Sequence, residues 1–104
     1  MRRWKLRDGD VLTAKILAAD LHPNADSGVL QLVLHVEPTA WPGERFTVYA
    51  PSSAGRDLEA AGACCYRDKQ GVTTYKLQHA PALWRIRRTT RLAVALVPAG
   101  SSEQ

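Results

Sequence analysis

PSSAGRDLEAAG, residues 51–62, decides the fold that the sequence predicts, because it is the one segment with helical character among many strand-like segments. Ser52 or Ser53 is suited to cap the start of a short, alanine-rich helix, and Gly62 is suited to end it. A helix of about two turns is marginal alone, so we expect it to pack against the rest of the protein.

Three strands are expected before this helix, because apolar and polar residues alternate there. One face of the first strand is predicted to carry Leu12, Ala14, Ile16 and Ala18. One face of the second is predicted to carry Leu30, Leu32, Leu34 and Val36. Residues 21–28, LHPNADSG, join the two as the turn of a β-hairpin. In a short third strand, Phe46 and Val48 are expected to point inward and Tyr49 outward.

Further strand patterns follow the helix, which brings the expected total to between five and seven. They cover residues 63–68, 72–78, 83–88 and 91–97. A helix between the third and fourth strands is the arrangement of the oligonucleotide/oligosaccharide-binding barrel, the OB-fold. We therefore predict an all-β protein, a small five-stranded OB-like barrel with one short helix between strands 3 and 4.

One domain is expected from a chain of 104 residues. The predicted organisation is a basic N-terminal arm over residues 1–8, a single barrel domain over 9–98 and a flexible tail over 99–104.

The first hairpin resembles the tRNA-binding OB domains appended to some aminoacyl-tRNA synthetases. The resemblance spans Ala14–Glu37 and rests on a His-Pro-Asn-Ala-Asp turn at residues 22–26, followed by an apolar strand. FTVYAPSSAG, residues 46–55, also lies where those domains have a strand ending in Ala-Pro. Their downstream motif of Ser, Asn and Met has no counterpart here. The resemblance implies an OB-fold that binds RNA, with tRNA as one candidate.

A later segment, Cys65–Ala80, resembles the last hairpin of OB proteins that bind single-stranded DNA. In those proteins a basic, polar strand turns through a glycine-containing loop into a strand rich in Thr and Tyr. The acidic tail common in the bacterial members is absent, since this chain ends in SSEQ. Both resemblances imply the same fold, although they imply different ligands.

Charge is distributed unevenly along a chain whose formal net charge is +4. Residues 69–102 contain six Lys and Arg residues and no Asp or Glu. Aromatic residues stand beside cations at Tyr66–Arg67, Tyr75–Lys76 and Trp84–Arg85. Cations can follow a phosphate backbone while bases stack on aromatic rings. The predicted nucleic-acid-binding residues are Trp41, Tyr66, Arg67, Lys69, Tyr75, Lys76, Trp84, Arg85, Arg87, Arg88 and Arg91.

Structural roles remain open for several of these residues. Trp84 alternates with Arg85 and Ile86 as in any half-buried strand, so it could be a core residue above a solvated arginine face. Trp41, in a proline-flanked loop, could stack on a base or pack over one end of the barrel.

Catalysis, cofactors and metals find no support in the sequence, and we expect a protein that is not an enzyme. The three histidines are scattered, without the spacing of zinc ligands or an orienting carboxylate. Cys64 and Cys65 are neighbours, which we interpret as small, partly buried residues rather than a disulfide framework. A membrane-spanning segment and a secretory signal are not apparent, so we expect a cytoplasmic protein.

Two functions are compatible with these features. The first is non-catalytic binding of single-stranded DNA or RNA, or of structured RNA, with an affinity that falls steeply as salt rises. The second is a protein-interaction module, such as a subunit or a phage-type inhibitor that docks on an acidic or nucleic-acid-binding partner protein. The oligomeric state is left open.

Overall fold

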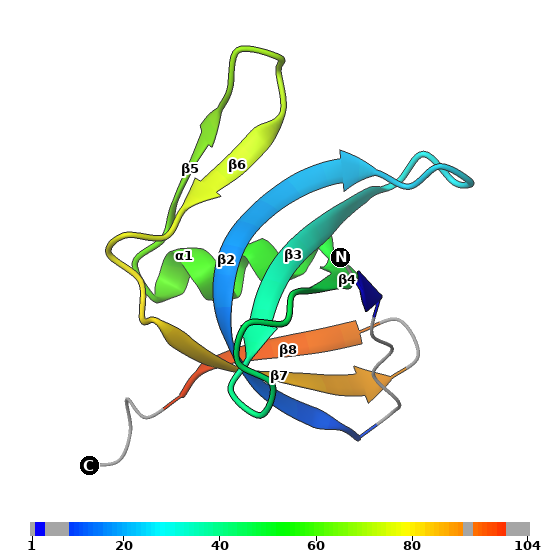
Figure 1. Cartoon of the computed structure of the whole chain (residues 1–104). Coiled ribbons are helices and arrows are strands. Elements are labelled where there is room, and N and C mark those ends of the chain that lie inside the picture. The colour runs from blue at the N-terminus through cyan, green and yellow to red at the C-terminus, as the bar shows by residue number, and fades with distance from the viewer. Residues whose placement is uncertain (1, 4–8, 91–92, 100–104) are drawn as a thin grey trace.

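The computed structural model of the chain describes residues 2–3, 9–90 and 93–99. Its strands are β1 (Arg2–Arg3), β2 (Val11–Pro23), β3 (Leu30–Pro38), β4 (Phe46–Pro51), β5 (Cys64–Arg67), β6 (Thr73–Lys76), β7 (Leu83–Thr90) and β8 (Ala93–Pro98). A 3₁₀ turn, η1 (Ser52–Ala54), leads into the single described α-helix, α1 (Gly55–Ala60). The protein is therefore mostly antiparallel β-structure with one short helix, as the sequence predicts (Figure 1).

β2 is the strand on which the sheet is organised. It pairs with β3 along most of its length, with β7 over residues 11–15 and with β6 at Asp20. Beyond these pairs, β4 lies on β3, β5 on β6 and β8 on β7. The described strands form one sheet of eight, β1 included, and no pairing joins β4 to β8. The pairing is thus more extensive than in the five-stranded barrel of the sequence analysis, and it is not closed.

A bulge in β2 changes which residues face the core. The register with β3 shifts between Ile16 and Ala18, so Leu17 is an extra residue. Leu12, Ala14 and Ile16 are buried before the bulge, but Ala19 is buried after it. The prediction that Ala18 shares a face with Ile16 is therefore wrong, because an unpaired residue inverts the alternation.

The core lies between the curved sheet and the helix. Its side chains come from every strand from β2 to β8 except β5, and from η1 and α1. Phe46 and Val48 are buried and Tyr49 is exposed, as predicted. Leu30 is exposed at the beginning of β3, although the three alternating apolar residues that follow it on that strand are buried. Among the residues whose burial the structure describes, Trp84 is the largest fully buried side chain, and its indole N–H donates to the Pro81 carbonyl at 2.9 Å.

The helix ends as predicted but begins differently. Gly62 has a φ of +115°, a left-handed conformation in which its N–H donates to the Glu59 carbonyl. Neither Ser52 nor Ser53 caps the helix through its side chain, because both lie in the preceding 3₁₀ turn and Ala54 is the N-cap residue.

Backbone contacts join residues near both ends of the described chain to the sheet. Arg2 and Arg3, within the predicted arm, form β1 and pair in parallel with Phe46 and Thr47. Ala99, within the predicted tail, donates its N–H to the Leu83 carbonyl at 2.9 Å.

Gly55→Ala is expected to lower the free energy of unfolding by about 1–3 kcal/mol, the usual cost of overpacking. A β-carbon on Gly55 would overlap the hydroxyl and ring of Tyr75, although the backbone φ of −59° suits any residue. Urea unfolding measures the change. Adding Tyr75→Phe removes the overlapping hydroxyl and should recover part of the loss. Wild-type stability in Gly55→Ala alone would contradict this packing.

Candidate functional site

Five predicted site residues lie on the β5–β6 hairpin, which projects beyond the rest of the sheet (Figure 1). Tyr66, Arg67, Lys69 and Lys76 are exposed. Tyr75 is buried against the helix, so it cannot stack on a base from this position. Tyr66 and Lys76 lie on one face of the hairpin, with the Lys76 ammonium 5.1 Å from the centroid of the Tyr66 ring. Arg67, paired with Thr73, lies on the opposite face.

Four other predicted residues lie on β7, and they do not share one face. Trp84 is only 1% exposed, which assigns it to the core rather than to a ligand surface. Arg85 and Arg87 are exposed on the outer face of β7. Arg88 is half-buried and points the other way, into a hollow beside β4. Arg91 lies outside the described residues.

The two basic segments attach to different parts of β2. β6 meets β2 at Asp20, while Arg85 is paired with Thr13. Seven residues at about 3.3 Å per residue separate these positions by roughly 23 Å along the strand. The stretch without carboxylates is therefore continuous in sequence but divided in space. Trp41 lies outside both basic segments, on the loop before β4, where its ring is tilted against that of Phe46 with the ring centroids 5.9 Å apart.

The sheet instead brings together a row of side chains across five strands. Tyr49 on β4 is paired with Val33 on β3, and Val33 with Asp20 on β2. Asp20 is paired with Thr74 on β6, and Thr74 with Tyr66 on β5. Directly paired residues project from the same face of a sheet, so all five lie on its outer face. We call this surface the tyrosine face.

An exposed tyrosine stands at each end of the tyrosine face. Tyr49 is 47% exposed and Tyr66 is 42% exposed. Four strand spacings of about 4.8 Å place their backbones about 19 Å apart. The bulge at Leu17 contributes to this arrangement, because it turns Asp20 outward. His22 lies on the same face, with its Nε2 atom 4.0 Å from an Asp20 carboxylate oxygen.

The first loop, residues 24–29, is held in shape by Asn24. The Asn24 side-chain oxygen accepts the N–H groups of Asp26 and Ser27 at 2.8 and 3.0 Å. The backbone of Asn24 also donates to Val29 and accepts from Gly28, which has a φ of +75°. The loop is therefore a rigid turn with its own hydrogen bonds, and it forms one border of the tyrosine face.

This turn also orients Gln31 beside Tyr49. Because Asn24 Oδ1 accepts two backbone N–H groups, its amide nitrogen is directed at Gln31 and donates to Gln31 Oε1 at 3.2 Å. The Gln31 carbonyl oxygen thus faces Asn24, and the Gln31 nitrogen is turned away from it as a donor.

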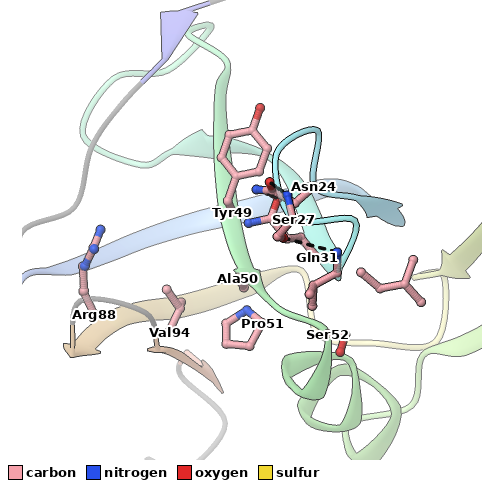
Figure 2. Close-up of a pocket in the computed structure, with 11 residues that line it drawn as sticks. Asn24, Ser27, Gln31, Tyr49, Ala50, Pro51, Ser52, Arg88 and Val94 are labelled. Carbon is pink, nitrogen blue, oxygen red and sulfur yellow. Dashed lines mark hydrogen bonds between the residues drawn. The ribbon is translucent and has the colours of Figure 1, made fainter.

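Two hollows flank Tyr49, and both are lined by Asn24 and Gln31. One extends over His22 and Asp26 on the outer face of the hairpin. The other crosses β4 to the open seam between β4 and β8, where Arg88 and Val94 line its far side (Figure 2). The site therefore offers an aromatic ring, amide donors and charges of both signs, rather than the uniformly basic strip that the sequence predicts.

The adjacent cysteines are both exposed, contrary to the expectation that they are partly buried. The Glu59 carboxylate accepts a hydrogen bond from the Cys65 thiol and raises its pKa, and partial desolvation adds to the effect. The raised pKa disfavours the reactive thiolate at neutral pH. Burial likewise raises the pKa of the Tyr75 phenol.

Among the residues that the structure describes, no three His, Cys, Asp or Glu side chains cluster in a way that could hold a metal ion. The same part of the chain contains no helix that is long and apolar enough to cross a membrane.

Tyr49 is the functional candidate that the sequence analysis missed. The alternation of residues 46–50 marks it as an outward aromatic residue, which was the available signal. In comparisons with known proteins, no protein family, curated protein or solved structure matches the chain. The choice of Tyr49 as a candidate therefore rests on the geometry of the structure.

Proposed function

We propose that this protein binds single-stranded nucleic acid on the tyrosine face, without chemistry. The observation that carries the proposal is the pair of exposed rings, Tyr49 and Tyr66, on one cross-strand row. Sheets that bind single strands use exposed aromatic rings as stacking platforms for bases, each worth about 1–3 kcal/mol. At a stacking rise of about 3.4 Å, the separation of about 19 Å corresponds to about five nucleotides, and to fewer in an extended strand.

We further propose that β4, β3, β2, β7 and β8 correspond to the five strands of an OB barrel. The antiparallel pairs β4–β3, β3–β2, β2–β7 and β7–β8 support this correspondence. The helix follows β4, which is the third of these strands in chain order, as expected for the fold. On this interpretation the β5–β6 hairpin is an insertion that widens the sheet beside β2.

Phosphate groups are best accommodated at the margins of the face. Lys76 lies over Tyr66 at one end, and Arg88 lines the hollow beside Tyr49 at the other. Asp20 in the centre disfavours a phosphate, so this part of the face suits the bases and their N–H groups. The Gln31 amide adds donors that suit base carbonyl oxygens and ring nitrogens.

Fluorescence anisotropy with labelled 12-nucleotide oligo-dT and oligo-U tests the proposal. Tyr49→Ala should weaken binding about 5- to 150-fold, the equivalent of 1–3 kcal/mol, while Tyr49→Phe keeps the ring and should bind as the wild type does. Two phosphate contacts predict a slope of about −1.4 for log K against log salt, whereas seven basic residues acting together would give about −5. Undetectable wild-type binding at low salt, or full binding by Tyr49→Ala, would contradict the proposal.

A further inference from the structure

The outer face of β2, β7 and β8 carries a second surface, distinct from the tyrosine face. Two cross-strand rows define it. In the first, Val11 is paired with Arg87, and Arg87 with Ala95. In the second, Thr13 is paired with Arg85, and Arg85 with Val97. A shallow groove runs over this surface, which we call the arginine–valine face.

Two aliphatic side chains are exposed on this face. Val11 is 54% exposed and Val97 is 51% exposed, and they stand on either side of the central strand β7. Single exposed apolar residues are ordinary, but these two share a groove with Ala95. Apolar surface gathered in one groove with charged side chains is typical of an interaction site.

Positive charge lies between the two valines. Arg85 and Arg87 project from the middle strand, and the exposed Lys15 follows Thr13 on the same face of β2. In the part of the chain that the structure describes, no carboxylate forms an ion pair with Arg85 or Arg87. The face therefore presents two guanidinium groups, which match carboxylates in a two-pronged geometry.

We propose that the arginine–valine face docks an extended, acidic segment of a partner protein. Arg85 and Arg87 are two residues apart on one strand, a separation of about 6.6 Å. Acidic residues at positions i and i+2 of an extended peptide have the same separation, so one carboxylate can pair with Arg85 and the other with Arg87. Aliphatic side chains beside them then cover Val11 and Val97.

The aliphatic character of this face favours a protein over a nucleic acid as its occupant. Aromatic rings are the usual stacking platforms for bases in single-strand-binding proteins, and this groove is lined by valine, alanine and arginine without an aromatic ring. Trp84, on the same strand, is buried on the opposite side of the sheet. The inference does not depend on nucleic-acid binding at the tyrosine face.

Selection of peptides from a random 12-residue display library against the folded protein tests the inference. We expect enrichment of peptides that carry Asp or Glu at alternate positions together with aliphatic residues. Binding of the enriched peptides should fall at least tenfold in Arg85→Glu/Arg87→Glu and severalfold in Val11→Ser/Val97→Ser. It should be unchanged in Tyr49→Ala and in the matched control Arg56→Glu/Arg67→Glu, which reverses two exposed arginines elsewhere.

Circular dichroism confirms that each variant is folded before its binding is compared. The inference is overturned if no peptide is enriched, if the enriched peptides lack acidic residues, or if the Arg85/Arg87 variant binds them as the wild type does. Competition by oligo-dT for the same face would assign it to nucleic acid instead. A wild-type dimer that Arg85→Glu/Arg87→Glu dissociates in sedimentation would show that a second copy of the chain is the occupant.

Discussion

Trp84→Ala should lower the free energy of unfolding by about 3–5 kcal/mol, which is the usual range for removal of a buried tryptophan. The Trp84 side chain is buried among the apolar residues of the sheet and helix. Its loss leaves a cavity, and it also removes the indole N–H that donates to the Pro81 carbonyl. A small domain is typically stable by about 5–15 kcal/mol, so the loss is a large fraction of the total stability.

Urea unfolding, followed by circular dichroism, measures this effect. Trp84→Phe keeps much of the ring and should lose less stability than Trp84→Ala. Trp41→Ala is the matched control, because Trp41 is exposed and its contact with Phe46 is worth about 0.5–1.5 kcal/mol. Equal losses in the two tryptophan-to-alanine variants would contradict the assignment of Trp84 to the core.

Tyr49→Ala/Tyr66→Ala should weaken binding of a 12-nucleotide single strand by about 2–6 kcal/mol, or about 30-fold to about 2 × 10⁴-fold, because each ring stacks on its own base. The backbones of the two tyrosines are about 19 Å apart across the sheet, so the effects of the two substitutions should be additive within about 0.5 kcal/mol. Anisotropy titrations of the wild type, the two single variants and the double variant make up the double-mutant cycle that measures additivity.

A trinucleotide gives the sharper form of this measurement, because it is too short to reach both rings. Its affinity for either single variant should stay close to the wild-type value, and only the double variant should lose binding. Tyr75→Phe, at the buried tyrosine, should leave binding unchanged. Strong non-additivity with the 12-nucleotide strand, or equal losses in both single variants with the trinucleotide, would contradict two separate stacking positions.

Local chemistry made several parts of the fold predictable. Alternation over residues 46–50 correctly separates the buried Phe46 and Val48 from the exposed Tyr49. Gly62 ends the helix because glycine accepts the left-handed conformation found there. Asn24 organises the first loop through hydrogen bonds within a few residues, which is the behaviour expected of an Asn-containing turn.

Non-local pairing explains what the sequence did not reveal. The bulge at Leu17 depends on how β2 matches β3, and no residue type marks it. The pairing of Asp20 with Thr74 joins segments that are far apart in the chain, and it is this pair that places Tyr66 on the same face as Tyr49. Conversely, Lys76 and Arg85 belong to one basic stretch of sequence, residues 69–102, but their strands attach to different parts of the sheet.

The threefold pairing of β2 also has a consequence for how the chain acquires its structure. Val11–Lys15 can form their pairing with β7 only when Leu83–Arg87 are present, and these residues follow about 70 residues later in the chain. Contacts between such distant segments carry a large loop-closure entropy and slow the formation of a fold. During synthesis on the ribosome, the hairpin of β2 and β3 can form early, yet one edge of β2 remains without its partner strand until β7 has emerged. Nascent chains of this protein therefore expose an unpaired strand edge while the residues between β2 and β7 are being synthesised.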